Sequence, residues 1–443
     1  MKMLRPFALL FSLAAAVLLA GCSGTRFEPP EIQGWPLMVE VDGKPVLLAL
    51  VKQEEVREVR FGGGRRSSST TRRDTYFHFE LRAYDPATAT PLWRRRVLSL
   101  GDPDAKKNIP LTRVVGSSES GHLLGQDGEL IWLQIADSPA AVSARDGGIV
   151  VTAETLENTN PELKGRLPSE ARHYGFDGGL VLLAADARQW RVRGAEGRAE
   201  AYSPPPAAVE AAPLKANGMP KIVPLRPYGE APARLAKTAD GWVGLFTERE
   251  AAEAANDAWG DKLAYPYSIL DEGAAARRTF WQVETATKQD RDESFEAMAG
   301  LTPIPGTPTY LRGRFVKQLP GDTPMAATDP AGLFVWHVTR MDDIGRLALA
   351  RVDASLQPVW TTELPLSDNS TGNPVHYWLL GDRIAVMGGL RTEADFVVGN
   401  EIHLVSVGLD DGDLLAHNLT REPTDRLDPS KVPPREVAPP VAP

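Results

Sequence analysis

Four arginines in one short loop are the side chains with the clearest capacity for chemistry. Arg65, Arg66, Arg72 and Arg73 lie within residues 61–75, a stretch otherwise rich in Gly, Ser and Thr that we expect to be a mobile loop. Guanidinium groups bind phosphate and carboxylate groups through paired hydrogen bonds, including lipid heads at a membrane surface. The loop is therefore a candidate contact for an anionic group or a protein partner. The alternative is a solvated insertion that its charge keeps soluble.

The seven histidines of the sequence do not have the short spacings of a zinc site. His78, His337 and His403 lie inside apolar segments, where a hydrogen-bonded core histidine is favoured over a catalytic base. Asp-rich runs at 342–343 and 410–413 lack the full spacing of a calcium loop, and Asp-Gly is common at hairpin turns. Nucleophile-elbow and phosphate-loop motifs are also missing from the sequence. We therefore assign no catalytic residue, no metal ligand and no cofactor.

The single cysteine, Cys22, ends an N-terminal segment with its own pattern. Lys2 and Arg5 precede an apolar run over residues 7–19, and Leu-Ala-Gly-Cys follows at 19–22. A basic start, a short apolar run and small residues are typical of a secretory signal. One cysteine also excludes an intrachain disulfide framework and a Cys-rich zinc site.

The end of this segment resembles the lipobox of bacterial lipoproteins. The resemblance implies a signal peptide over residues 1–21, an acylated Cys22 and a tether over 22–35. Ser23 is not acidic, which in such lipoproteins implies transfer to the outer membrane, here facing the periplasm. The alternative is an ordinary signal peptide or a membrane anchor with a chance cysteine, but the apolar run is too short to span a bilayer.

Composition and charge narrow the function classes. The chain has 443 residues, 42% of them hydrophobic, and a net charge of -9. Removal of Lys2 and Arg5 with the signal peptide leaves 47 basic against 58 acidic residues, so the charge becomes -11. This balance argues against nucleic-acid binding, and no segment beyond the N-terminus is apolar enough for a polytopic membrane protein. Lipid on Cys22, not a basic surface, is the predicted contact with the bilayer.

Beyond the tether, short apolar runs bounded by Gly, Pro, Asp or Asn predict an all-β meander of antiparallel hairpins. A degenerate repeat accompanies them, with an apolar strand, an Asp turn and a strand that opens with Trp. Residues 81–93 and 349–360 are two copies, and a third copy at 403–415 lacks the Trp. A repeat of 40 to 57 residues of this kind predicts a β-propeller, whose blades bury their faces on their neighbours.

These copies resemble the quinoprotein-like repeat of pyrroloquinoline-quinone dehydrogenases and of the propeller lipoprotein in the outer-membrane protein assembly machinery. Residues 329–353 also look like an uncharacterised family of proteobacterial lipoproteins, which has no established activity. The repeats here are irregular and interrupted by long insertions. The resemblance therefore implies a common fold more than a common role.

We predict one propeller domain over residues 36–420, with seven blades or, as the alternative count, eight. Closure of the ring would pair an early strand, 37–41 or 46–51, with a late one, 383–388 or 401–407. Two stacked sandwiches are the alternative fold.

Insertions and a tail interrupt or follow this domain. Residues 203–234 form a Pro- and Ala-rich insertion, and residues 248–299 a partly helical one. Within the second, we expect a helix over 248–259 with Thr247 as its N-cap and a short helix over 289–299. The Pro-rich tail over 421–443 is expected to be disordered.

Three function classes fit these features. We expect a membrane-anchored scaffold of the cell envelope, without catalytic activity, that binds an envelope protein partner. A small-ligand or glycan binder is one alternative. A quinoprotein-like enzyme is another, although the vicinal disulfide of many such dehydrogenases needs more than one cysteine.

Overall fold

A computed structural model describes the chain over residues 25–61, 70–100, 120–135, 138–204, 215–216, 234–255, 276–290, 293–316, 326–328, 331–341, 345–367, 375–391 and 401–421. The predicted signal peptide, Cys22, Arg65 and Arg66 lie outside these residues. Most of the insertion over 203–234 and nearly all of the tail over 421–443 lie outside them as well. No helix in the described part of the chain is long and apolar enough to cross a membrane.

The described strands form six sheets, and each contains four strands paired antiparallel in chain order. The first sheet contains β1 (Thr25–Phe27), β2 (Glu31–Ile32), β3 (Leu37–Val41), β4 (Lys44–Phe61), β5 (Thr70–Asp85) and β6 (Thr90–Leu100). The second contains β7 (Gly121–Asp127), β8 (Leu130–Ile135), β9 (Ser138–Ser143) and β10 (Ile149–Val151). The third contains β11 (Tyr174–Phe176), β12 (Leu180–Leu183), β13 (Gln189–Arg193) and β14 (Arg198–Ala201). The expected all-β meander is thereby confirmed.

The fourth sheet contains β15 (Lys215–Ala216), β16 (Leu235–Thr238), β17 (Gly241–Phe246), β18 (Arg277–Asp290), β19 (Glu293–Pro303) and β20 (Tyr310–Leu311). The fifth contains β21 (Arg314–Phe315), β22 (Ala326–Thr328), β23 (Ala331–Val338), β24 (Arg346–Val352) and β25 (Pro358–Ser367). The sixth contains β26 (His376–Leu379), β27 (Arg383–Leu390), β28 (Glu401–Gly408) and β29 (Leu414–Asn418). The short helices are α3 (Ala153–Thr159), α4 (Glu248–Ala255), η1 (Pro161–Leu163), η2 (Ala171–His173) and η4 (Leu419–Arg421).

Five hydrophobic clusters join the sheets in series. They connect the third sheet to the second, the second to the first, the first to the sixth, the sixth to the fifth and the fifth to the fourth. In β8, Ile131 and Leu133 pack against the first sheet, while Leu130 and Trp132 pack against the third. A strand covered on both faces needs a continuous apolar run, not an alternating one, which explains why β8 reads LIWLQI.

The first and sixth sheets meet face to face. Leu47, Ala49 and Val51 of β4 share one buried cluster with Met387 of β27 and Leu404 of β28. The strands expected to pair at closure therefore lie in two different sheets and contact each other through side chains, so the expected shared sheet is wrong. We call this contact between the first and the last described sheet along the chain the closing junction.

Two tryptophans of the repeat dock on glycines of the next sheet. A Cβ at Gly147, in the turn between β9 and β10, would lie 2.7 Å from the Trp93 ring of β6. A Cβ at Gly412, in the turn between β28 and β29, would lie 2.8 Å from the Trp360 ring of β25. Both glycines have φ near +70°, where a side chain is strained. Trp93 and Trp360 are thus structural residues, as the repeat predicts.

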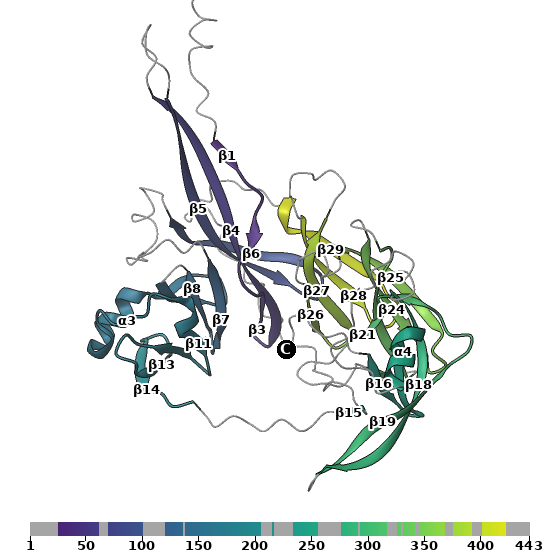
Figure 1. Cartoon of the computed structure of the whole chain (residues 1–443). Helices are drawn as coiled ribbons and strands as arrows, with labels where there is room; N and C mark the ends of the chain where they lie inside the picture. Colours follow the sequence, from purple (N-terminus) through teal and green to yellow (C-terminus); the bar gives the residue numbers. More distant parts are fainter. Residues whose placement is uncertain are drawn as a thin grey trace, which may run out of the picture.

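Two long hairpins extend beyond the four-stranded units. The β4–β5 hairpin projects from the body and the β18–β19 hairpin projects at the opposite end (Figure 1). The two sheets that contain these hairpins each span more residues of the chain than the repeat period of 40 to 57 residues. The described residues therefore contain six sheets, where division by the repeat period predicts seven.

The hairpins also correct two local predictions. Residues 70–75, expected to lie in the arginine loop, belong to β5, and Arg72 and Arg73 pair with Val59 and Glu58 of β4. The helix expected over 289–299 is wrong, because residues 293–299 form the start of β19, paired along β18. Neither segment has a strong local preference for one secondary structure. Pairing in the long antiparallel ladder therefore makes both of them strands.

The other expected helix is confirmed over residues 248–255, and residues 256–259 lie outside the described part of the chain. In α4 the Thr247 hydroxyl accepts a hydrogen bond from the Glu250 amide at 3.0 Å, and the Glu250 carboxylate accepts one from the Thr247 amide at 2.9 Å. This reciprocal pair is a capping box. Glu250 also accepts hydrogen bonds from Arg278, which hold the helix on the fourth sheet.

Candidate functional site

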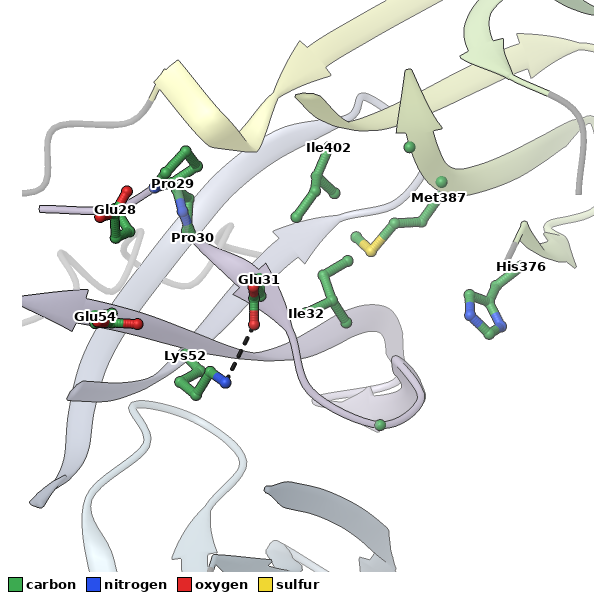
Figure 2. Close-up of a pocket in the computed structure, with 13 residues that line it drawn as sticks. Glu28, Pro29, Pro30, Glu31, Ile32, Lys52, Glu54, His376, Met387 and Ile402 are labelled. Carbon is green, nitrogen blue, oxygen red and sulfur yellow. Dashed lines mark ion pairs between the residues drawn. The ribbon is translucent and has the colours of Figure 1, made fainter. Parts of the chain in front are cut away.

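A pocket of about 470 Å³ opens at the closing junction, between the first and sixth sheets. Its first wall is the segment from Glu28 to Gly34 with neighbouring residues of β4, and its second wall comes from β26, β27 and β28. Figure 2 shows Ile32, Met387 and Ile402 directed into one shared space. The centre of the pocket is thus apolar.

The first wall is held by hydrogen bonds to β4. The Glu28 amide donates to the Glu54 carbonyl at 2.9 Å, and the Gln33 amide donates to the Leu50 carbonyl at 2.7 Å. Between them, β2 pairs with β4 at Glu31 and Ile32. Residues 25–27 and 31–32, which were expected to lie in the tether, are therefore strands of the first sheet, and residues 28–32 line the pocket.

His376 forms one end of the pocket (Figure 2). Its ring lies near those of Trp35 and Trp378, with centroid distances of 5.6 and 6.3 Å. The residue is 8% exposed, and no hydrogen bond to its imidazole occurs within the described residues. Burial lowers the pKa of His376 to about 4, so at neutral pH it presents an uncharged ring with one donor and one acceptor nitrogen.

Charged side chains line the other end. Glu28, Glu31 and Glu54 provide three carboxylates, and Lys52 provides one ammonium group. Lys52 forms an ion pair with Glu31 at 3.2 Å (Figure 2). Arg26 contacts Glu28 from outside the pocket. The lining groups therefore carry more negative than positive charge.

A second cluster of polar groups, Glu55, His78 and Ser99, crosses the first sheet next to this wall. His78 Nε2 lies 2.8 Å from Glu55 Oε2, and His78 Nδ1 lies 2.8 Å from Ser99 Oγ. Burial raises the pKa of Glu55, but hydrogen bonds from Arg57 and His78 outweigh it and keep that pKa below its usual value. These are the residue types of a hydrolase triad.

The exposure of this cluster argues against catalysis. Ser99 is 5% exposed, His78 1% and Glu55 0%, so the hydroxyl is not presented to a substrate. His78 is therefore the hydrogen-bonded core histidine that the sequence predicts. His403 is similar, since it is buried and its Nε2 lies 3.1 Å from Glu401 Oε2.

The residues singled out from the sequence do not meet at the pocket. Cys22, Arg65 and Arg66 lie outside the described residues, and Arg72 and Arg73 lie in β5, in the projecting hairpin. No group of three or more His, Cys, Asp or Glu in the described ranges is placed to hold a metal ion. The acidic run at 410–413 forms the turn before β29, where the Asp411 carboxylate accepts the Asp413 amide at 3.0 Å.

Sequence reasoning missed the pocket because its walls come from distant parts of the chain. His376 is one of seven scattered histidines, and only its position in the apolar run VHYWL indicated burial. A comparison of the sequence with protein-family models and with curated proteins found no match. The chemistry of the site therefore has to be argued from its own residues.

Proposed function

We propose that the protein is a lipid-anchored scaffold of the cell envelope, built as a β-propeller without catalytic activity, that binds an envelope protein partner. In this proposal Cys22 carries the lipid, at the periplasmic face of the outer membrane. The projecting β4–β5 hairpin is the observation that carries the scaffold role (Figure 1). It extends from the body as two strands of 18 and 16 residues.

The propeller form is supported by the packing order of the sheets. Each described sheet is a four-stranded meander, and buried clusters join the sheets in the order third, second, first, sixth, fifth and fourth. The first sheet packs on the last through ten buried residues, and within the described residues no such cluster joins the third and fourth sheets. Trp93 and Trp360 each dock on a turn of the following sheet, as expected when blades repeat around an axis.

The hairpin offers backbone edges to a partner. In the described residues, Glu58–Phe61 of β4 pairs only with Thr70–Arg73 of β5. The outer edge of β4 is covered by β1 only as far as Arg57, and the outer edge of β5 is covered by β6 only from Phe77 onward. An uncovered strand edge can add a strand from another protein. Arg72 and Arg73 lie in β5 of this hairpin, and Arg65 and Arg66 lie between its two strands in the sequence. In this proposal the four arginines add charge contacts with an acidic partner.

The anchor is tested by Cys22→Ala. We expect loss of the fatty-acyl label and release of the protein from the membrane fraction, because one cysteine is the only acylation site of this kind. Retention of the label and of membrane binding in this variant would contradict the anchor.

The scaffold role is tested by shortening the hairpin. Residues 58–73 are replaced by Asn-Gly between Arg57 and Asp74, which are paired in the ladder and fit a two-residue turn. Photo-crosslinking in cells from a reactive residue at Thr75 should give a discrete protein adduct in the parent chain and lose it in the shortened one, with an unchanged melting temperature. Arg65, Arg66, Arg72 and Arg73 changed together to Ser should weaken the adduct. Equal adducts in all three chains would contradict the role.

A further inference from the structure

We propose that the pocket at the closing junction binds a proline-rich segment in the polyproline II conformation, and that its occupant is a segment of this chain, residues 437–443. This contact goes beyond the scaffold function and does not depend on it. Three observations carry the proposal: the place where the described chain ends, the uncharged sequence of the segment, and a group of rings beside the apolar centre of the pocket.

The described chain ends beside the pocket. The Thr420 hydroxyl accepts a hydrogen bond from the Ile402 amide at 2.7 Å, and Ile402 lines the pocket. Arg421, the last described residue, forms an ion pair with Glu401 at 3.2 Å. Residues 422–443 therefore follow directly from the second wall of the pocket.

The chain beyond Arg421 is long enough for this contact. Fifteen residues, 422–436, separate Arg421 from the proposed segment. At about 3.1 Å per residue in polyproline II they span roughly 45 Å, which exceeds the width of a pocket of about 470 Å³. A linker of this length gives an effective concentration in the millimolar range, so a segment with a Kd of about 0.1 mM would occupy the pocket in about nine molecules of ten.

The sequence of the segment suits an apolar pocket. Residues 437–443 read VAPPVAP, with three prolines and no charged side chain. Proline fixes its own φ and disfavours a helical conformation in the residue before it, so this sequence favours polyproline II. The other Pro-rich run, residues 432–434, is flanked by Lys431 and Arg435, and burial of their charges would be costly.

The apolar centre of the pocket continues at one end into a group of three rings (Figure 2). The rings of Trp35 and Trp378 lie 5.6 and 6.3 Å from the ring of His376. Trp35 is 37% exposed, so part of its ring is accessible beside the pocket. Proline-rich segments in polyproline II dock on aromatic-lined grooves, and their preformed conformation lowers the entropy lost on binding.

Ion pairs at the other end of the pocket favour an uncharged occupant. Lys52 pairs with Glu31 at 3.2 Å, and Arg26 pairs with Glu28. A charged ligand would have to compete with these pairs, whereas residues 437–443 leave them intact. The segment therefore matches the apolar centre and the rings without disturbing the charged end.

Cross-linking from the segment tests where it lies. Benzoylphenylalanine replaces Ala442 in the purified full chain at pH 7, and the photo-adducts are mapped by mass spectrometry. We expect most adducts within residues 28–35 and 376–402, whereas benzoylphenylalanine at Asp428, the matched control, should give few there. A mixture of light and isotopically heavy chains separates contacts within a chain from contacts with a second copy. Adducts elsewhere, or adducts only between light and heavy chains, would overturn the proposal.

A free peptide tests the affinity. A fluorescent peptide of residues 437–443 is titrated with the full chain and with a full-length variant in which Pro439, Pro440 and Pro443 are changed to Ser. We expect the variant to bind the peptide with a Kd of about 0.1 mM, and the parent to bind it about tenfold more weakly because its own segment competes. Equal affinities, or no saturable binding to the variant below about 1 mM, would refute the proposal.

Two further changes in the Ser variant place the peptide at this pocket. Trp35→Ser should weaken peptide binding about fivefold by removing the accessible ring, and Ile32→Ser should weaken it by a similar factor of about five. Val359→Ser, which changes a 50% exposed apolar residue of β25 outside the pocket, is the matched control and should leave the affinity unchanged. Unchanged affinity in both pocket variants would show that the peptide binds elsewhere and would overturn the proposal.

Discussion

The junction between the fifth and sixth sheets and the closing junction are built differently. At the first, the Trp360 ring covers Gly412, and its Nε1 donates to the Asp410 carbonyl at 3.1 Å. At the closing junction, the sixth sheet has Leu414 and Leu415 after its Asp turn, and Leu415 is 37% exposed instead of docked. The copy of the repeat that lacks a Trp is thus the one that precedes the pocket.

The turns on which these side chains dock, or would dock, also differ between the two kinds of junction. Gly147 and Gly412, which receive a Trp, have no side chain, whereas the turn at the closing junction has Ala89 at φ +53°. Ala89 is buried there in the cluster between the first and sixth sheets. Aliphatic packing and hydrogen bonds replace the Trp, including one from the Ser406 hydroxyl to the Ala87 carbonyl at 2.6 Å.

Leu404→Ala should have the largest effect, because Leu404 is fully buried in the cluster that holds the closing junction. We expect a loss of about 3 kcal/mol in the free energy of unfolding, measured by urea titration. Hydrogen exchange should accelerate in β3 and β26, whereas Leu364→Ala, in the cluster between the fifth and sixth sheets, should leave β3 protected. A loss below about 1 kcal/mol would show that this cluster does not hold the closing junction.

Acid should weaken the closing junction through His376. Because burial lowers its pKa to about 4 from 6.5, the unfolded chain binds the proton first as pH falls. Stability from the neutral ring is complete above pH 6.5 and decreases toward pH 4, by about 3 kcal/mol at pH 4. The free energy of unfolding, measured by urea titration at pH 7 and at pH 4.5, should therefore decrease less in His376→Phe than in the parent chain. The same pH dependence in both proteins would refute the assignment to His376.

Gly147→Ala and Gly412→Ala should each cost about 2 kcal/mol, since a new Cβ meets a Trp ring and a left-handed backbone disfavours a side chain. Ala89→Gly is the matched change at the closing junction. We expect it to be neutral within about 1 kcal/mol. Equal losses for all three in chemical denaturation would remove the distinction between the docked and undocked turns.

Ser406→Ala should have a small effect, a loss of about 1 kcal/mol, because it removes the hydrogen bond that the hydroxyl donates to Ala87 and the one that it accepts from Arg383. Thr362→Val, which removes the hydrogen bond to the Gly412 carbonyl, is its counterpart where Trp360 docks. The contact between Trp360 and Gly412 remains in this variant, so its loss in the free energy of unfolding should be smaller. Thermal unfolding of the two variants side by side measures the difference, and a larger loss for Thr362→Val would contradict it.

Local patterns predicted much of the fold. The runs 130–135 and 346–352 are strands with the expected ends, β8 and β24, because Gly, Asp or turn residues bound a continuous apolar sequence. Thr247 predicted the start of α4 as its N-cap, because a cap of this kind needs only neighbouring residues. The repeat predicted that Trp93 and Trp360 are structural.

Predictions failed where a distant strand decided the outcome. Residues 293–299 have helix-forming Glu, Ala and Met, yet they form β19 because β18 offers a ladder along its whole length. Residues 25–32 have no long apolar run, yet β4 is long enough to pair with them beyond the end of β3. Local preference is weak in both segments, so tertiary pairing overrides it.

The sequence by itself determined the strands, the turns and the residues that dock between sheets, because each depends on neighbours within a few positions. The closing junction was decided only by the tertiary structure, which brings Ile32 and Lys52 of the first sheet against His376 and Met387 of the sixth. More than 300 positions separate these walls in the chain. No local pattern encodes a cavity of this kind, because its walls meet only when the first and sixth sheets pack together.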